Sequence, residues 1–105
     1  MKKLTSFQSK YLRGLAHGLK PVVFVGQKGV TGALIKSADE AFRQHELIKV
    51  KFVDFKEKEQ KKTIAATIEY KTNCQMAGMI GHIAIFYKQH SDPDKRKIVL
   101  PNNPN

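Results

Sequence analysis

The sequence predicts a single α/β domain in which amphipathic helices alternate with short strands, and three observations predict it. The chain has 105 residues, enough for one modest core without disulfide or metal staples. Apolar residues recur at helical spacing in three segments and form short β-branched or alternating runs in the others. Two of these runs, residues 22–25 and 47–53, flank one helical segment, so we expect a parallel, right-handed βαβ unit.

The first helix is expected between Thr5 and Gly18. Thr5 and Gln8 have the spacing of a capping box, and Gly18 suits a helix end. The residues expected to face the core share helical spacing: Leu4, Phe7, Tyr11, Leu12 and Leu15. The opposite face carries basic side chains without an acid among them: Lys3, Lys10, Arg13 and His17. That face could contact RNA or could simply be solvated, and the sequence leaves both open.

The first strand, residues 22–25, runs into a short loop made of Gly26, Gln27, Lys28 and Gly29. Glycine permits positive φ and lets a ligand approach the backbone closely. The helix that Thr31 begins presents unpaired N–H groups to the loop, where they favour an anion. We interpret the loop as a phosphate-binding turn with Lys28 at its tip. Because it lacks the full pattern of either nucleotide-binding fingerprint, an ordinary tight turn remains the alternative.

The remaining elements follow from the same periodicities. The second helix should bury one apolar face: Leu34, Ile35, Ala38, Ala41 and Phe42. The strand at 47–53 should direct Ile48, Val50 and Phe52 to one side. A third helix, capped near residues 54–57 and ending at about Tyr70 or Lys71, should bury Ile64, Ala65 and Ile68 and keep its charged start, 56–62, in solvent. The runs 74–80 and 82–87 suggest a hairpin around Gly81 with a bulge at Gly78, and we expect 102–105 to be disordered.

Charge is the strongest compositional signal. The net charge is +10, and seven basic residues precede the first acid, Asp39, whereas twelve basic residues face nine acids from there onward. A domain this basic typically meets a polyanion. No stretch is apolar enough for a membrane span or a signal peptide, and the single cysteine, Cys74, fits a reducing compartment. We therefore expect a cytoplasmic protein, and a monomer.

Catalytic groups are not evident in the sequence. The four histidines, His17, His45, His82 and His90, have no metal-ligand spacing with one another or with Cys74. No nucleophile elbow occurs, and the carboxylates lie mainly on helix faces that look solvated. We predict a binding module that has no catalytic residue, no metal site and no cofactor.

Several blocks, in this order, resemble one known family. They are residues 12–31, which include Val25-Gly26-Gln27-Lys28-Gly29-Val30-Thr31, then 46–52, 80–88 and 95–101. Together they resemble the CRM domain, the chloroplast RNA splicing and ribosome maturation module, in its stand-alone bacterial YhbY-type form. The resemblance covers about residues 4–101.

The resemblance implies a four-stranded mixed sheet with three helices, ordered as an N-terminal helix and then β-α-β-α-β-β, similar in shape to the C-terminal domain of translation initiation factor 3. It also implies that the glycine loop acts like the GxxG loop of KH domains, which clamps a nucleic-acid backbone. Bacterial members associate with precursors of the large ribosomal subunit, so the implied ligand is ribosomal RNA.

The predicted RNA-binding residues are those of the loop and its basic surroundings: Gly26, Gln27, Lys28, Gly29 and Thr31, flanked by Lys20 and Lys36 and extended by Lys10 and Arg13. Most aromatic residues fit core positions, which argues against base stacking. The part played by the basic cluster at 95–97 stays open. The alternatives are an RNA chaperone or intron-splicing cofactor and, in other classes, a protein-interaction module or a membrane-surface binder.

Overall fold

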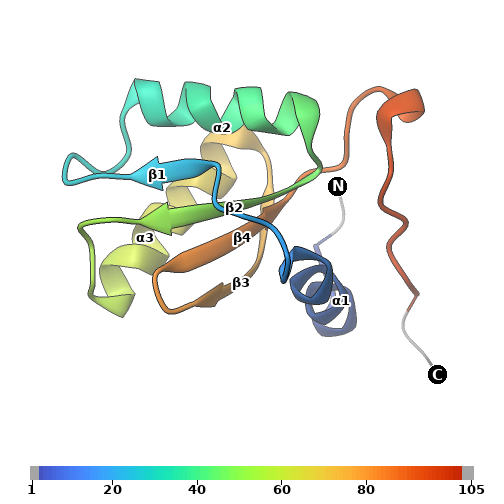
Figure 1. Ribbon diagram of the computed structural model, residues 1–105, viewed down its shortest axis with the longest axis horizontal. Coiled ribbons are helices and arrows are strands. Elements are labelled where there is room, and N and C mark those ends of the chain that lie inside the picture. Colours follow the sequence, from blue (N-terminus) through green and yellow to red (C-terminus); the bar gives the residue numbers. More distant parts are fainter. Residues whose placement is uncertain (1–2, 103–105) are drawn as a thin grey trace.

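The computed structural model describes residues 3–102, and Figure 1 shows their arrangement. The helices are α1 (Ser6–Ala16), α2 (Gly32–Gln44) and α3 (Lys58–Thr72). The strands are β1 (Val23–Val25), β2 (Leu47–Phe52), β3 (Gln75–Ile80) and β4 (Ile83–Tyr87), followed by a 3-10 turn at Pro93–Lys95. The element order is the expected one, an N-terminal helix and then β-α-β-α-β-β. Asn102 is exposed and has no regular structure, and the rest of the segment expected to be disordered, 103–105, lies outside the described residues.

The four strands form one mixed sheet in the order β1-β2-β4-β3. Strand β1 pairs in parallel with β2, with Val23 opposite Val50, so β1, α2 and β2 form the predicted βαβ unit. Strand β4 is antiparallel to both of its neighbours, β2 and β3. The β3–β4 reversal contains Gly81 at φ 59°, and the register shifts between Met76 and Gly78, which confirms the predicted bulge.

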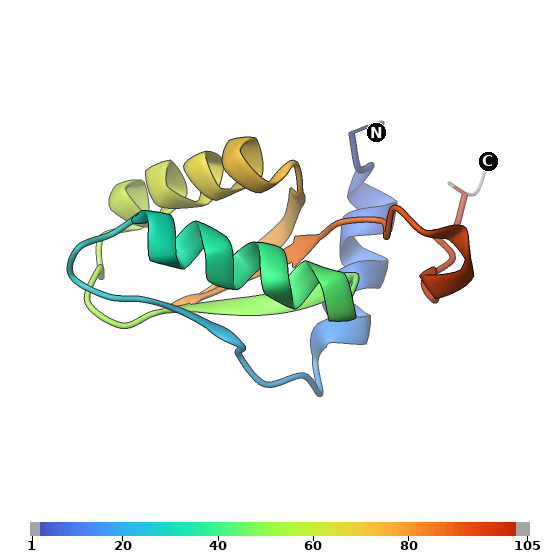
Figure 2. The ribbon, with the colours of Figure 1, turned by 90° about the horizontal axis from the view of Figure 1, so that it is seen from above.

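Helices α2 and α3 cover one face of the sheet (Figures 1 and 2). Side chains that point inward from the strands pack against both helices there and form the main hydrophobic cluster. Its buried residues include Val25, Ile48, Val50, Phe52, Ile68 and Phe86. The predicted stripe of α2 is confirmed in its centre, since Leu34, Ala38 and Phe42 are buried whereas Ile35 and Ala41 are half-buried. Ile64, Ala65 and Ile68 of α3 are buried as expected.

Helix α1 lies against the other face, where it contacts β2, β3 and β4. Its capping box is confirmed, because Thr5 accepts from the Gln8 N–H and the Gln8 side chain accepts from the Thr5 N–H. Leu12 of the predicted core stripe is fully buried, as is Ala16, and Leu4 packs against the same cluster. The prediction is wrong for Phe7, Tyr11 and Leu15, which are exposed. The reason is that α1 covers only one end of the sheet (Figure 2), so a narrow strip of it makes contact.

The charged start of α3 contains a second departure from expectation. Lys61 is buried rather than solvated, and its Nζ donates to the Gly81 carbonyl over 2.6 Å. An ammonium group can be buried when a hydrogen-bond acceptor meets it. Lys61 therefore ties α3 to the β3–β4 turn.

The C-terminal segment after β4 runs back to α1. Leu100 and Ile98 pack against the smaller cluster around Leu12 and Ala16, and the Gln8 Nε2 donates to the Pro101 carbonyl over 3.2 Å. Glu46, buried between α2 and β2, holds the other end of this segment. The C-terminal segment thus packs against one end of the domain, between the α2–β2 connection and α1.

Candidate nucleic-acid interface

The glycine loop is a tight turn that joins β1 to α2. The Gly29 N–H donates to the Gly26 carbonyl over 3.0 Å, which places Gln27 and Lys28 at the exposed tip. Gly29 adopts φ 67°, a left-handed conformation that favours glycine. A Cβ on Gly26 would meet only Asp54 Oδ2, at 3.8 Å, so Gly26 leaves open space beside the turn.

Helix α2 begins directly after the loop, with Thr31 as its N-cap. The Thr31 hydroxyl accepts from the Leu34 N–H over 3.1 Å, as the sequence predicted. The N–H groups of Gly32 and Ala33 have no acceptor within the helix and point toward its N-terminal end. They add to the positive end of the helix dipole, beside the Lys28 side chain.

Loop, strand and helix together line a groove of about 500 Å³ along the β1 edge of the sheet. Its lining includes all five predicted loop residues: Gly26, Gln27, Lys28, Gly29 and Thr31. Ala33 and Ser37 of α2 form one wall, and Phe24 of β1 with Val22, just before the strand, forms another. The structure therefore assembles a concave surface with backbone donors, one ammonium group and an aromatic ring.

Phe24 is the residue that sequence reasoning missed. Its side chain is 55% exposed, and it sits opposite Lys51 on β2, on the face of the sheet that α1 leaves uncovered. The expectation that the aromatic residues fit core positions is wrong here, because β1 is an edge strand whose outward position has no helix above it. The sequence held one sign of this exposure. Side chains alternate between the two faces of a strand, so Phe24 points away from the face that Val23 and Val25 share.

Residues 4–88 match the family model described as the CRS1/YhbY (CRM) domain, which is most of the chain. The chain belongs to the CRM domain family. A Haemophilus influenzae relative named an RNA-binding protein is 38% identical over 101 residues, which is 96% of this chain and 98% of the relative. The Bacillus subtilis protein YqeI, named a probable RNA-binding protein, is 35% identical over 98 residues, 93% of this chain and 99% of YqeI.

A solved structure has the same fold as this CRM domain. It is the solution structure of a Staphylococcus aureus hypothetical protein for which RNA binding is suggested, with a TM-score of 0.79 and 31% sequence identity. The likeness covers 93% of this chain and 99% of the other.

The basic residues predicted to extend the loop surface of the CRM domain are placed elsewhere. Lys20 and Lys36 are exposed but do not line the groove. Lys10 and Arg13 lie on α1, which Figures 1 and 2 place at the end of the sheet far from the loop. Arg13 is half-buried over Gly78, and its Nη1 donates to the Ala77 carbonyl over 2.8 Å. The predicted basic surface is therefore divided into two regions, one near the loop and one on α1. The Arg13 guanidinium is already engaged in a hydrogen bond within the domain.

One acidic side chain approaches the loop of the CRM domain. Asp54 is exposed and lies just after β2. Its Oδ2 would lie 3.8 Å from a Cβ placed on Gly26. On the other side, the Phe55 ring packs near Gly29. Because a carboxylate repels a phosphate, Asp54 opposes the attraction that Lys28 and the helix end provide.

Cys74, the single cysteine of the chain, is buried. Burial raises the pKa of the Cys74 thiol to about 11, so the thiol stays protonated at neutral pH. The Thr72 hydroxyl donates to the sulfur over 3.0 Å, which acts in the opposite direction but is outweighed by burial. Among residues 3–102 no group of three or more His, Cys, Asp and Glu side chains could hold a metal ion. In the same part of the chain, no helix combines the length and apolarity needed to cross a membrane.

Proposed function

We propose that this CRM domain is a cytoplasmic, non-enzymatic RNA-binding protein that docks on ribosomal RNA in precursors of the large ribosomal subunit and assists their assembly. Its membership of the family and the RNA-binding names of its relatives support the RNA ligand. The choice of ribosomal RNA comes from the resemblance to bacterial members of the family.

The observation that carries the proposal is the groove beside the glycine loop. The free N–H groups of the α2 terminus, the Lys28 ammonium and the open backbone at Gly26 are together suited to an RNA phosphate. Contacts of this kind supply affinity and position but carry little sequence information, so the RNA would be chosen by its shape. Phe24 at the groove edge adds a surface on which an unpaired base can stack.

The test compares Lys28→Glu with Lys62→Glu, which makes the same charge change at an exposed position of α3. Binding to large-subunit ribosomal RNA is measured by filter retention over a series of salt concentrations. We expect only Lys28→Glu to weaken binding and to make the salt slope shallower by about 0.7–0.9, the value of one phosphate contact. Equal losses in both variants would remove the loop from the mechanism.

Assembly is tested in a lysate. Wild-type protein should sediment with large-subunit precursors and not with mature ribosomes, and Lys28→Glu should move it to the top of the gradient. Crosslinking that recovers mainly messenger or intron RNA would instead favour the RNA-chaperone or splicing alternative. Binding to anionic vesicles without any affinity for RNA would overturn the proposal.

A further inference from the structure

A second pocket, of about 560 Å³, is formed by three segments that are far apart in the sequence. Leu15 and Leu19 come from the end of α1 and the turn after it, residues 43–47 connect α2 to β2, and residues 90–98 belong to the C-terminal segment. Figure 1 places these segments at the end of the sheet away from the glycine loop. The family match ends at residue 88, so the last wall of this pocket lies outside the matched residues.

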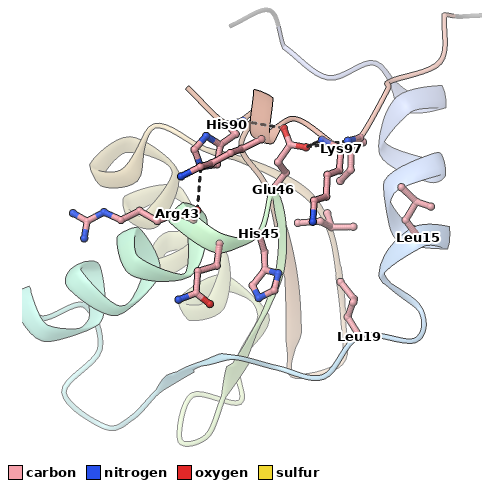
Figure 3. Close-up of a pocket in the computed structure, with 11 residues that line it drawn as sticks. Leu15, Leu19, Arg43, His45, Glu46, His90 and Lys97 are labelled. Carbon is pink, nitrogen blue, oxygen red and sulfur yellow. Dashed lines mark hydrogen bonds between the residues drawn. The ribbon is translucent and has the colours of Figure 1, made fainter. Parts of the chain in front are cut away.

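One wall of the pocket is aliphatic. Leu15 is 44% exposed and Leu19 is 41% exposed, and Figure 3 shows both on the side facing His45 and Lys97. Leu47 and Ile98 complete the apolar lining. Two leucines exposed within one concave surface favour a ligand that covers them with a flat apolar group.

The opposite wall carries two ammonium groups, those of Lys95 and Lys97, and one carboxylate, that of Glu46, whose oxygens already accept backbone N–H groups. Glu46 is 6% exposed, and its Oε1 accepts the N–H groups of Lys97 (2.7 Å) and Ile98 (2.9 Å). Its Oε2 accepts the His90 N–H over 2.9 Å. The ammonium groups of Lys95 and Lys97 therefore have no free carboxylate to meet among the described residues that line the pocket.

The two histidines of the pocket differ in their availability. His90 is committed to the fold, because its Nδ1 accepts the Asp92 N–H over 3.0 Å and its Nε2 lies 3.0 Å from the Arg43 carbonyl, to which it then donates. The His45 side chain is exposed, and Figure 3 shows it below Glu46, on the side of the pocket across from Leu19. The Arg43 side chain points away from this space. His45 is thus the ring that a ligand can contact.

We propose that this pocket accepts one unpaired nucleotide of the bound RNA. The base lies between the leucine wall and the His45 ring, and the phosphate lies near Lys95 and Lys97. A nucleotide joins a flat, largely apolar ring to an anion, which is the combination that these two walls complement. The volume falls within the roughly 300–1,000 Å³ typical of small-ligand sites. The inference rests on the proposed function for the source of the nucleotide.

The test uses the full chain and two RNA hairpins with the same loop, one with a fully paired stem and one whose stem carries a single-nucleotide bulge, so that the bulged nucleotide is their one difference. The variants are His45→Ala and Lys97→Gln, which keep the backbone hydrogen bonds of both residues. Their controls are His17→Ala and Lys71→Gln, exposed residues that do not line the pocket. We expect each pocket variant to weaken binding of the bulged hairpin by about fivefold or more, as loss of a stacked base does, and to leave the paired hairpin unchanged.

The outcomes separate this inference from the proposed function. An equal loss of affinity for both hairpins would mean that His45 and Lys97 contact only the RNA backbone, and it would overturn the pocket assignment. No loss of affinity for either hairpin would overturn it too. Wild-type protein that binds neither hairpin would overturn the proposed function as well. Lys28→Glu, by contrast, should weaken both hairpins to a similar extent.

A second measurement identifies the ligand class directly. Titration with adenosine monophosphate, followed by amide NMR shifts, should perturb Leu15, Leu19 and Ile98 more than the glycine loop. If the protein shows these shifts but binds no RNA, the ligand of the pocket is a free nucleotide, and the proposal that it takes a nucleotide of bound RNA is overturned. A peptide carrying tyrosine and glutamate that perturbs the same amides more strongly would assign the pocket to a protein partner and overturn it too.

Discussion

The two glycines of the loop have different physical roles. Gly29 occupies a positive-φ conformation, whereas Gly26 does not and faces open space. Their spacing in the sequence made them look equivalent, yet only one is required by backbone geometry. Gly26 matters for access to the groove.

Replacing Gly29 by alanine should destabilise the fold, because a Cβ is strained in the left-handed region. We expect Gly29→Ala to lower the free energy of unfolding by roughly 1–2 kcal/mol. Gly26→Ala should change it little, since its Cβ would make only an ordinary 3.8 Å contact with Asp54. Urea unfolding monitored by circular dichroism measures both, and equal stability of the two variants would contradict this distinction.

Removal of the Asp54 charge should strengthen RNA binding. At roughly 6 Å in water, one carboxylate repels one phosphate charge by about 0.7 kcal/mol, which corresponds to about threefold in affinity. We therefore expect Asp54→Asn to bind ribosomal RNA about threefold more tightly at low salt. Glu40→Gln, an exposed change of the same charge on α2, is the control. A weaker Asp54→Asn complex would mean that Asp54 supports the loop.

At the scale of elements, the Glu46 carboxylate accepts three backbone N–H groups of the C-terminal segment and so helps to hold it against the rest of the domain. Burial alone would raise the pKa of Glu46, but the N–H groups of His90, Ile98 and Lys97 outweigh it, and the pKa of Glu46 is lowered. A lowered pKa in the folded state means that the unfolded state binds the proton more readily. The stabilisation is therefore complete above the ordinary carboxyl pKa and is lost as the pH falls through the lowered value.

Glu46→Gln should release this attachment at neutral pH. We expect a loss of about 1.5–3 kcal/mol, the typical contribution of hydrogen bonds to a charged group. The difference between wild type and variant should shrink as the pH is lowered, because acid removes the same charge from the wild type. Unfolding at a series of pH values measures it, with Glu40→Gln as the matched substitution. A difference that stays constant with pH would show that the charge is not responsible.

Local sequence signals predicted the elements well where the decisive contacts are local. Thr5 and Thr31 cap their helices, Gly81 turns the hairpin and Gly78 follows the bulge, each through neighbours within a few residues. The failures all involve distant partners. Lys61 is buried because its Nζ meets the Gly81 carbonyl, and Phe7, Tyr11 and Leu15 are exposed because only a narrow strip of α1 meets the sheet. Helical spacing alone does not say how wide a face the rest of the protein will cover.

At the scale of the molecule, the two candidate binding sites lie toward opposite ends of a body that extends 41 Å along its longest axis. The loop between β1 and α2, which contains Lys28, lies at one end, and the C-terminal segment, which contains Lys95 and Lys97, lies at the other (Figure 1). The sequence predicted the loop because a glycine pattern is contiguous. It left the role of residues 95–97 open and could not reveal the second pocket, whose walls come from both termini and the middle of the chain.

The strand order has a consequence for synthesis of the chain. The last strand to be made, β4, occupies an interior position between β2 and β3. Until residue 87 has emerged, β2 has an open edge on that side, and β3 has no partner. Unpaired strand edges are templates for pairing with other chains. A nascent chain that stalls before β4 is therefore exposed to aggregation, because two of the three strand pairings, β2–β4 and β4–β3, can form only after the last strand has been made.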